Sequence, residues 1–359
     1  MTHQTSQTAL SYRDALHKAM HDAMATSGKT ILFGQGINDH KGIFGTTTGL
    51  SEKFGKNRVI EVPLAEEGVT GICVGAALNG TYPINVHIRA DFVLLAMNQI
   101  INLAAKYKYM FGGLFDVPMM IRLVIGRSWG QGAQHSQSLQ SLFAHIPGLT
   151  VIMPASSGAI IDSYAHAVHH HRGPVISLEH RLMYDLTFER DHEPQVLGRT
   201  PFSQRQVRTG SDVTVVSTSI MSLEARRAAD WLADRGISCD VIDLHCVSHI
   251  DVNVIMKSVT RTGRLLVADT SWLPYGVAAE ICRLVCESDP GVLKAPVVSL
   301  GMAAAPCPTA KSLEDIYYPN LTTLTDSIAK LVRGRRDHGI DLPHERSMAD
   351  VYKRFKGPF

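Results

Sequence analysis

The hydrophobic and polar positions of this chain alternate between short apolar runs rich in β-branched residues and longer stretches with helical spacing. In the first half the short runs predict strands at 30–34, 58–62, 82–88, 119–125, 149–154 and 173–179. The longer stretches predict helices at 11–25, 68–80, 92–110 and 156–171. Continuous apolar strands separated by helices are typical of a parallel sheet covered on both faces, so we expect an α/β domain.

The pattern lapses between residues 185 and 210 and then resumes. The segment TFERDHEPQVLGRTPFSQRQ is polar and contains two prolines, which suits a linker. The second half predicts strands at 212–219, 238–245, 264–269 and 295–301 and helices at 222–236, 251–263 and 276–287. We therefore expect an α/β domain at 8–185, a linker at 186–205, a second α/β domain at 206–335 and a polar C-terminal extension at 336–359.

Composition and charge exclude several classes of protein. The chain has 359 residues, of which 45% are hydrophobic, so it can bury a sizeable core. The net charge is +2 and no long basic run is present, which gives no indication of nucleic-acid binding. No apolar window of about 18 residues predicts a membrane span. The first residues, MTHQTSQTAL, lack a basic stretch followed by an apolar core, so we expect a cytoplasmic location.

The sequence contains none of the common self-contained catalytic or phosphate-binding motifs. There is no GxxxxGK[ST], no GxGxxG at a strand-to-helix turn, no GxSxG and no HExxH. Three consecutive histidines at 169–171 end a predicted helix, where their side chains point in different directions. We interpret them as a solvated terminus and predict no metal site.

The segment VPLAEEGVTG, residues 62–71, places Glu66 and Glu67 at the start of a predicted helix. Acidic side chains there interact favourably with the helix dipole, so ordinary capping is one interpretation. Because the following helix is apolar nearly all round, we expect it to be buried. A carboxylate at the mouth of a buried helix lies in a low-dielectric setting and can share a proton with a ligand, which is the second interpretation.

Two further segments place chemically interesting side chains where predicted strands end. Phe92 lies at a strand-to-helix junction, where α/β proteins place ligands, and a core phenylalanine is the alternative. The segment AQHSQSL, residues 133–139, contains His135 and Ser136. Ser136 is a candidate cap for a helix starting at Gln137, and His135 is a candidate for acid–base chemistry.

In this order and spacing, these segments resemble one family, the beta subunit of the thiamine-diphosphate-dependent first component of 2-oxoacid dehydrogenase complexes (pyruvate, branched-chain and acetoin types). The resemblance runs from about Tyr12 to Arg333. It is carried by SYRDAL, VPLAEEGVTGICVGAALNG, ADFVLLAMNQIINLAAKYKYMFGG, GQGAQHSQSLQSLFAHIPGLTVIMP, GPVISLEHRLMY, GSDVTVVSTS and CDVIDL.

The resemblance implies a fold, a cofactor and three site residues. The fold is a transketolase-like pyrimidine-binding domain, a parallel-sheet α/β domain, followed by a smaller transketolase C-terminal α/β domain. Glu66 matches the glutamate that hydrogen-bonds the aminopyrimidine ring of thiamine diphosphate. Phe92 matches the aromatic side chain that packs against this ring, and His135 matches the active-site histidine of the beta subunit.

The resemblance also implies partners. The family forms heterotetramers of two alpha and two beta chains, and a lipoyl acyltransferase core is a further expected partner. In the family the alpha subunit carries the Mg²⁺–diphosphate site, with a Gly-Asp-Gly motif followed by Asn. This sequence contains no Gly-Asp-Gly. We therefore expect this chain to bind the aminopyrimidine half of the cofactor, with the diphosphate and Mg²⁺ on the alpha subunit.

The reaction implied by the resemblance is decarboxylation of a 2-oxoacid and transfer of the acyl fragment to a lipoyl carrier. A histidine at the mouth of such a site orients the substrate carboxylate or supplies a proton, and the sequence does not decide which role His135 has. The alternative is a split transketolase-like or acyloin-forming enzyme with a non-lipoyl acceptor. A third class is a non-enzymatic paralogue, against which the presence of Glu66 and His135 counts.

The sequence departs from the family pattern at several places. Gln35 and Gly36 stand where two acidic residues are associated with a network between active sites. In the second domain LHCVSHID, with His245 and His249, replaces LRTIxPxD, and ADTSWLPYG replaces a turn that contains Glu. The loop HHHRGPV stands where the family has an acidic loop that binds potassium, so we do not expect that ion to carry over.

Overall fold

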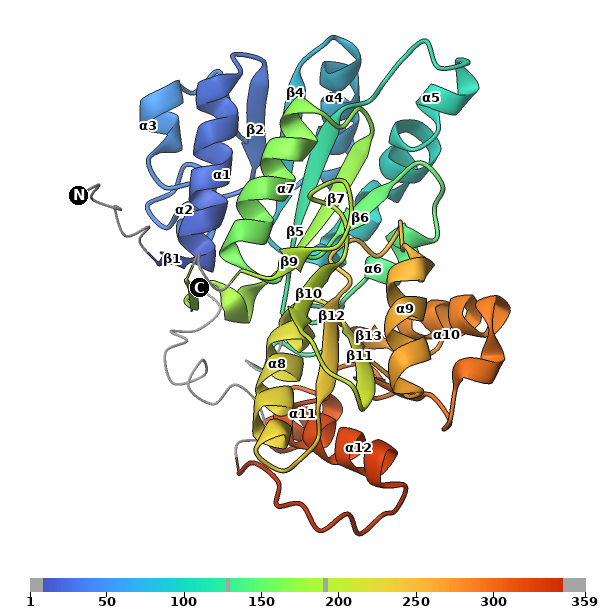
Figure 1. The fold of residues 1–359 in the computed structure, drawn as a ribbon. Helices are drawn as coiled ribbons and strands as arrows, with labels where there is room; N and C mark the ends of the chain where they lie inside the picture. Colours follow the sequence, from blue (N-terminus) through green and yellow to red (C-terminus); the bar gives the residue numbers. More distant parts are fainter. Residues whose placement is uncertain (1–8, 127–129, 190–192, 345–359) are drawn as a thin grey trace, which may run out of the picture.

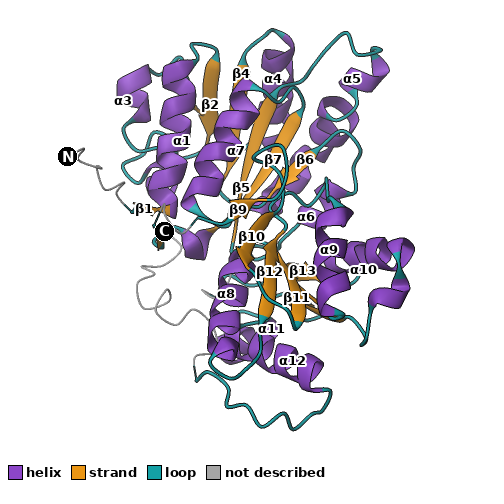
Figure 2. Cartoon of the chain, viewed as in Figure 1, coloured by secondary structure: helices purple, strands orange, loops and turns teal. Residues whose placement is uncertain are grey.

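The structure, a computed structural model, describes residues 9–126, 130–189 and 193–344. Two six-stranded sheets follow each other along the chain, and helices pack around both. Figures 1 and 2 show the first sheet in the upper part of the view and the second below it. The α/β class that the sequence predicts is confirmed for both parts of the chain.

All strands of the first sheet run parallel, in the order β3-β2-β4-β5-β7-β6. Their bounds are β2 Thr30–Gly34, β3 Val59–Glu61, β4 Tyr82–His87, β5 Met119–Ile125, β6 Thr150–Ile152 and β7 Pro174–His180. Every residue of β4, β5 and β7 is buried, as expected for strands covered on both faces. The carboxyl ends of these strands meet along one edge, where α/β proteins place ligands.

The helices of the first domain lie in two layers. Their bounds are α1 Tyr12–Thr26, α2 Gly42–Gly45, α3 Leu50–Phe54, α4 Glu66–Leu78, η1 Ala90–Ala96, η2 Asn98–Ala104, α5 Tyr107–Met110, α6 Gln140–Ala144, α7 Ser157–His169 and η3 Arg181–Met183. Met120 and Val124 of β5 share an apolar cluster with α1 and α7. Met119 and Ile121 of the same strand share another with α4, η1 and η2. Alternate strand residues therefore serve opposite helix layers.

Short polar side chains set the starts of several helices. Ser11 Oγ accepts a hydrogen bond from the backbone N–H of Asp14 (3.0 Å) at the start of α1. Ser156 Oγ accepts one from the N–H of Ala159 (3.2 Å) at the start of α7. Each bond satisfies a donor that the first helical turn leaves without a partner, which explains why the elements begin close to where the sequence predicts them.

The prediction of one continuous helix at 92–110 is wrong. The structure divides this segment into a 3₁₀ helix (η1), a π-helix (η2) and the short α5. In the π-helical part, the N–H of Ala105 donates to the carbonyl of Ile100 (3.0 Å), five residues earlier. Apolar spacing does not distinguish these windings, because each of them places a run of apolar side chains on the core side.

The second sheet is mixed, with the strand order β14-β13-β11-β12-β10-β9. Its strands are β9 Gln195–Val196, β10 Arg205–Arg208, β11 Val213–Ser217, β12 Cys239–Asp243, β13 Leu265–Trp272 and β14 Val298–Met302. The helices of this part are α8 Ile220–Ala233, α9 Val252–Thr262, α10 Val277–Ser288, η5 Pro290–Val292, α11 Lys311–Tyr317 and α12 Leu321–Arg333. Strands β11 to β14 pair in parallel, whereas β10 is antiparallel to both β12 and β9.

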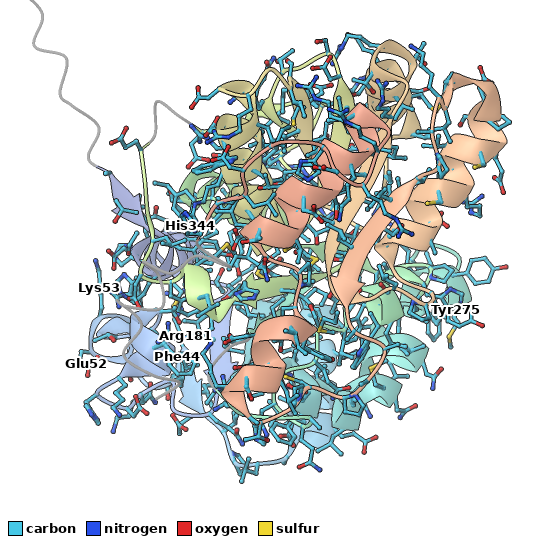
Figure 3. The ribbon with its side chains drawn as sticks, turned by 90° about the horizontal axis from the view of Figure 1, so that it is seen from below. Phe44, Glu52, Lys53, Arg181, Tyr275 and His344 are labelled. Atoms are coloured by element: carbon cyan, nitrogen blue, oxygen red, sulfur yellow. The ribbon has the colours of Figure 1, made fainter. Side chains whose placement is uncertain are left out.

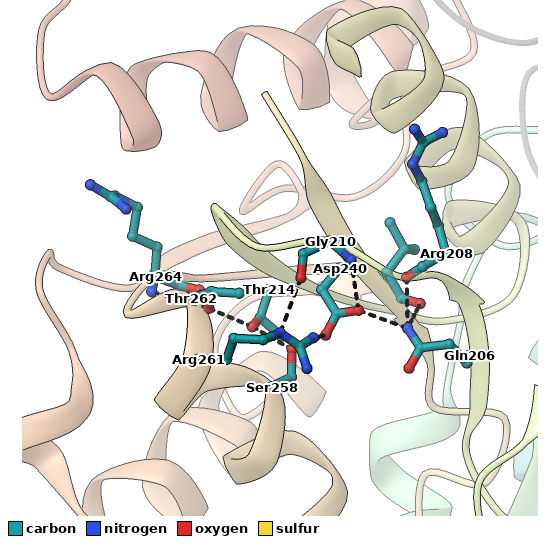
Figure 4. Close-up of polar contacts among 10 residues, drawn as sticks. Gln206, Arg208, Gly210, Thr214, Asp240, Ser258, Arg261, Thr262 and Arg264 are labelled. Atoms are coloured by element: carbon teal, nitrogen blue, oxygen red, sulfur yellow. Dashed lines mark hydrogen bonds and ion pairs between the residues drawn. The ribbon is translucent and has the colours of Figure 1, made fainter. Parts of the chain in front are cut away.

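A buried carboxylate ties the antiparallel edge of this sheet to its parallel part (Figure 4). Asp240 on β12 accepts hydrogen bonds from Gln206 Nε2 (2.9 Å) and from the N–H of Gly210 (3.3 Å). Ser258 and Arg261 of α9 also bond to this carboxylate. Because each of its oxygens has donors, the charge can be buried without a large desolvation penalty.

Residues 186–205, expected as a polar linker, contain regular structure. Strand β8 (Thr187–Phe188) pairs with β1 (Leu10–Ser11), and β9 pairs with β10. The backbone groups of this polar segment therefore find partners in neighbouring strands, which hydropathy does not reveal.

The two sheets are joined by a short antiparallel bridge. The N–H of Met153 donates to the carbonyl of His245 (2.7 Å), and the N–H of Val247 donates to the carbonyl of Val151 (2.9 Å). A single apolar cluster also contains residues from both domains, including Val151, Leu244 and Val267. The end of β6 and the residues after β12 are therefore held in register.

The first part of the predicted C-terminal extension packs against the second domain. Asp341 pairs with Arg235 (2.7 Å), and the carbonyl of Asp341 accepts a hydrogen bond from Trp231 Nε1 (3.0 Å). Residues 345–359 of the extension lie outside the described residues. Within the described ranges, no helix has the length and apolarity needed to cross a membrane.

Candidate functional site

The first site segment is the turn from β3 into α4, which places Glu66 and Glu67 in the first helical turn as the sequence predicts. No side chain caps this helix, so the two carboxylates are the groups that complement its dipole. Glu66 is half-buried and lines a cavity, whereas Glu67 is exposed, 3.4 Å from the amide of Gln99. The structure thus separates the two glutamates, which the sequence pattern alone does not.

The expectation that α4 is buried all round is wrong for this chain by itself. Val69, Cys73 and Val74 face the core, but Ile72 is 61% exposed. Leu64, just before the helix, is 83% exposed. Helix α4 is apolar on two faces, one that packs on the core and one that faces outward. Large exposed apolar areas of this kind mark sites of contact with a partner.

The second site segment is the end of β4, where Asn85 and His87 are buried side by side. The Asn85 amide donates to Thr70 Oγ1 (3.2 Å) and lies 3.1 Å from His87 Nε2. Burial lowers the pKa of His87 to about 4, so the imidazole is neutral near pH 7. With the amide donating to Nε2, the ring proton lies on Nδ1.

The third segment brings Phe92 and His135 into contact. Their ring centroids are 5.3 Å apart with an interplanar angle of 78°, an edge-to-face arrangement. Phe92 is 39% exposed, so it is not a core phenylalanine. The aromatic face that the sequence predicts for a ligand therefore lies beside the candidate acid–base group.

The loop that carries His135 is shaped by glycine and by the second domain. Gly132 has φ 72°, and a Cβ atom there would lie 2.7 Å from Thr309 Oγ1. The carboxylate of buried Asp91 accepts a hydrogen bond from the N–H of Gln137 (3.1 Å), which anchors the loop two residues after His135. Burial raises the pKa of Asp91.

The prediction that Ser136 caps a helix starting at Gln137 is wrong. The helix α6 begins at Gln140, its N-cap is Leu139, and no side chain caps it. Ser136 itself is buried in the preceding loop. Because the loop turns toward Thr309 and Asp91 before it becomes helical, His135 lies in an irregular segment and not in the first turn of a helix.

The three predicted site residues line one cavity of about 340 Å³ at the carboxyl edge of the first sheet. The cavity is lined by Gln35, Phe44, Val62, Pro63, Leu64, Glu66, Val69, Asn85, Val86, His87, Ile88, Arg89, Phe92, Gln131 and His135. Sequence reasoning missed Asn85, His87 and Arg89. A positional signal existed for His87 and Arg89, because they lie at the end of the strand predicted at 82–88.

Two of the departures from the family pattern lie at the cavity and at the contact of the two sheets. Gln35 lines the cavity, and the N–H of Gly36 donates to Glu61 Oε1 (2.6 Å). His245 is buried at the bridge between the sheets, where its Nε2 lies 2.8 Å from Ser163 Oγ. His249 lies 2.8 Å from Ser248 Oγ in the same region. These two histidines belong to the contact between domains.

The cavity suits the aminopyrimidine half of thiamine diphosphate. It offers one carboxylate (Glu66), two aromatic rings that are not buried (Phe44 and Phe92) and an apolar wall at Val62, Leu64 and Val69. Within the described parts of the chain, no group of three or more His, Cys, Asp or Glu side chains is arranged to hold a metal ion.

Comparisons with known proteins agree with this geometry. The family model "Transketolase, pyrimidine binding domain" matches residues 8–187, and "Transketolase, C-terminal domain" matches residues 204–324. The beta subunit of the pyruvate dehydrogenase E1 component of Bos taurus is 35% identical over 333 residues, which cover 91% of this chain and 92% of the relative. The beta subunit of acetoin:2,6-dichlorophenolindophenol oxidoreductase of Cupriavidus necator is 34% identical over 340 residues, covering 90% and 98%.

A solved structure described as a split gene transketolase, inactive beta4 tetramer, matches with a TM-score of 0.73. The match covers 90% of this chain and 99% of that chain at 20% sequence identity. At this identity the likeness establishes the fold and not the reaction.

Proposed function

Because this chain belongs to the family of beta subunits of the thiamine-diphosphate-dependent first component of 2-oxoacid dehydrogenase complexes, we propose that it acts with an alpha subunit to decarboxylate a 2-oxoacid and pass the acyl group to a lipoyl carrier. The observation that carries this proposal is the single cavity lined by Glu66, Phe92 and His135.

The proposed reaction balances with the lipoyl disulfide as the oxidant. The bond between the carbonyl carbon and the carboxylate breaks and CO₂ leaves. The carbonyl carbon then forms a thioester with one lipoyl sulfur, while the other sulfur takes up a proton as a thiol. When bound, thiamine diphosphate supplies the nucleophilic carbon and the electron sink for this step.

Each site residue has a distinct proposed task. Glu66 holds a proton in common with the aminopyrimidine ring nitrogen, for which its place at the mouth of α4 is suited. Phe92 offers a face to the same ring. His135, in edge contact with Phe92, orients the substrate carboxylate or carries a proton at the cavity mouth. Neutral His87 adds an N–H donor to the cavity wall.

An alpha subunit would complete this half-site. We propose that it carries the diphosphate and Mg²⁺, and that two chains of each kind assemble into a heterotetramer. Exposed apolar side chains around the cavity support such a partner: Leu64, Ile72 and Leu95 are 83%, 61% and 61% exposed. A partner that covers them would also exclude water from Glu66, which the isolated chain leaves half-exposed to solvent.

The proposal is tested by co-purifying this chain with its alpha subunit and measuring CO₂ release from a panel of 2-oxoacids with an artificial electron acceptor. We expect CO₂ release from at least one oxoacid and its loss, by about 100-fold or more, in Glu66→Gln. Asp315→Asn, at a partly exposed position of α11, is the matched control for loss of one carboxylate. Carboligation of aldehydes without turnover of any oxoacid would instead establish the transketolase-like or acyloin-forming alternative.

A further inference from the structure

The cavity contains one permanently charged cation, Arg89, to which the proposed reaction assigns no role. Among the described residues that line the cavity, the other ionisable groups are Glu66, His87 and His135. Arg89 follows β4 by two residues and is the N-cap of η1, so it lies between His87 and Phe92 along the chain. Arg89 is only 8% exposed and its Nη1 donates to the carbonyl of Ile88 (3.0 Å), so the guanidinium is buried in the wall of the site.

The surroundings of Arg89 fix its position. The guanidinium carbon lies 5.7 Å from the centroid of the Phe44 ring, which also lines the cavity. The guanidinium of Arg181 lies 4.6 Å from the same centroid and 5.0 Å from that of Tyr184. Figure 3 shows Phe44 and Arg181 next to each other. Two guanidinium groups therefore flank one aromatic ring at this end of the cavity.

The backbone at Phe44 reinforces this arrangement. Phe44 has φ 58°, in the left-handed region that bulky residues rarely adopt. Strained backbone of this kind persists where the surrounding structure holds it, and it is concentrated at ligand sites. Here it presents the ring of Phe44 to both arginines, of which Arg181 also lies 3.8 Å from Asp185.

An arginine in this setting recognises an anionic group of a ligand. Its planar fork of donors matches a carboxylate or phosphate in two parallel hydrogen bonds. Neutral His87, two residues earlier, lines the same cavity with a fixed donor and does not add charge. The anion that this wall suits is one that enters the cavity with the substrate.

The carboxylate that leaves as CO₂ is a poor match for such an arginine. Its negative charge moves into the rest of the molecule as the bond breaks, so an ion pair with a fixed cation would stabilise the reactant more than the transition state. A second anionic group, which keeps its charge throughout the reaction, adds binding energy without this penalty.

We propose that Arg89 receives a second anionic group of the substrate, so that the substrates of this enzyme are 2-oxoacids that bear a carboxylate or a phosphonate away from the reacting carbonyl. The inference rests on the proposed function and names the substrate class of the same site. Arg181 acts as a positioning residue, because it contacts the Phe44 ring beside Arg89 and does not line the cavity.

The test compares four oxoacids on the complex with the alpha subunit: pyruvate, 4-methyl-2-oxopentanoate, 2-oxoglutarate and 3-phosphonopyruvate. For the wild type, kcat/KM for CO₂ release is expected to be at least about 10-fold higher with one of the two acids that carry a second anion. The comparison of 2-oxoglutarate with 3-phosphonopyruvate shows whether the enzyme prefers a carboxylate or a phosphonate as the second anionic group.

Variants of Arg89 test whether the preference for a second anionic group comes from this residue. Arg89→Gln is expected to lower kcat/KM for the preferred acid by roughly 30-fold or more, mainly through KM, and to change that for pyruvate by less than about 3-fold. Arg89→Lys keeps the charge without the fork and is expected to restore part of the loss. Arg283→Gln, on the exposed surface of α10, removes one arginine elsewhere and is expected to match the wild type.

The possible failures are distinguishable. A wild-type enzyme that prefers pyruvate or 4-methyl-2-oxopentanoate would overturn the inference alone, whether or not the Arg89 variants fold. An equal loss for all four acids in Arg89→Gln would also overturn it, because Arg89 would then serve a part that every substrate shares. No CO₂ from any oxoacid would overturn the proposed function itself.

Discussion

His87 is an ionisable side chain that burial keeps uncharged within the candidate site. It lines the cavity, and its Nε2 lies 3.1 Å from the Asn85 amide. Burial lowers its pKa to about 4, from about 6.5 in an exposed setting. Near neutral pH, His87 therefore contributes hydrogen bonding and no charge to the cavity.

This burial predicts a pH dependence of stability. Between about pH 6.5 and pH 4 the unfolded chain binds a proton at His87 and the folded chain does not, so acid favours unfolding. Through His87, the free energy of unfolding is expected to fall by up to about 3 kcal/mol across this window. Urea denaturation of wild type and His87→Gln at several pH values measures the difference, and the variant is expected to have the shallower slope.

The matched control is His40→Gln, which removes an exposed histidine and is expected to keep the wild-type slope. Other histidines whose pKa is lowered by burial, such as half-buried His171 and buried His245, add to the slope of all three proteins and cancel in the comparison. Identical slopes for wild type and His87→Gln would contradict the buried, neutral state of His87.

Site residues that lie in long sequence motifs could be predicted from the sequence. Site residues whose role depends on how the elements pack could not. Glu66, Phe92 and His135 lie in segments whose pattern extends over many positions, and they meet in one cavity. His87 and Arg89 lie within or just after an apolar strand, where nothing in the pattern tells which side chains turn toward a ligand. Their environment exists only once β4, α4 and the His135 loop are brought together.

Among the elements, strands β5 and β7 at the centre of the first sheet are joined by a buried ion pair. Arg122 Nε and Nη2 each donate to an oxygen of Glu179 at 2.6 Å, and both side chains are fully buried. Tyr164 and Tyr184 donate further hydrogen bonds to Glu179. Burial acts to lower the pKa of Arg122, but the adjacent carboxylate outweighs it and the pKa is raised.

Removal of one partner would leave an uncompensated charge between these strands. Glu179→Gln is expected to lower the free energy of unfolding by about 3–5 kcal/mol, because Arg122 keeps its charge in a site without water. Asp315→Asn, which breaks the exposed pair with Lys311, is the matched control and is expected to change stability by less than about 1 kcal/mol. Similar small effects of both variants, measured by urea denaturation, would contradict the structural role of the pair.

The order of elements followed from the sequence, but their winding and pairing did not. Alternating apolar runs are sufficient to place β2 to β7 and the longer helices α1, α4 and α7, because each run marks a surface that must be buried. The same runs do not separate the 3₁₀, π and α windings between Ala90 and Met110. They also do not reveal that β10 runs antiparallel, since that depends on which strand edge accepts it.

For the whole molecule, the exposed apolar side chains around the cavity are the feature that calls for a partner. Leu64, Ile72 and Leu95 come from the turn before α4, from α4 and from η1, and the two helices pack against each other. A monomer gains nothing from exposing such a surface. We therefore expect the alpha subunit to cover it and to close the cavity.

A charge on this surface is expected to prevent assembly without unfolding the chain. Ile72→Glu should leave the unfolding free energy within about 0.5 kcal/mol of wild type, because the side chain is exposed. Co-purification with the alpha subunit should be lost, because assembly would bury an unpaired carboxylate. Ser288→Glu, which adds the same charge at an exposed polar position at the end of α10, is the matched control. Retention of the alpha subunit by Ile72→Glu would contradict the proposed contact.

The most direct test of the central claim, that this chain holds only half of a thiamine diphosphate site, is calorimetric titration of the cofactor with Mg²⁺. The account predicts strong binding when this chain and the alpha subunit are mixed, weaker binding when the chain carries Glu66→Gln, and no binding to this chain alone. Binding to this chain alone, as tight as to the mixture, would contradict the account.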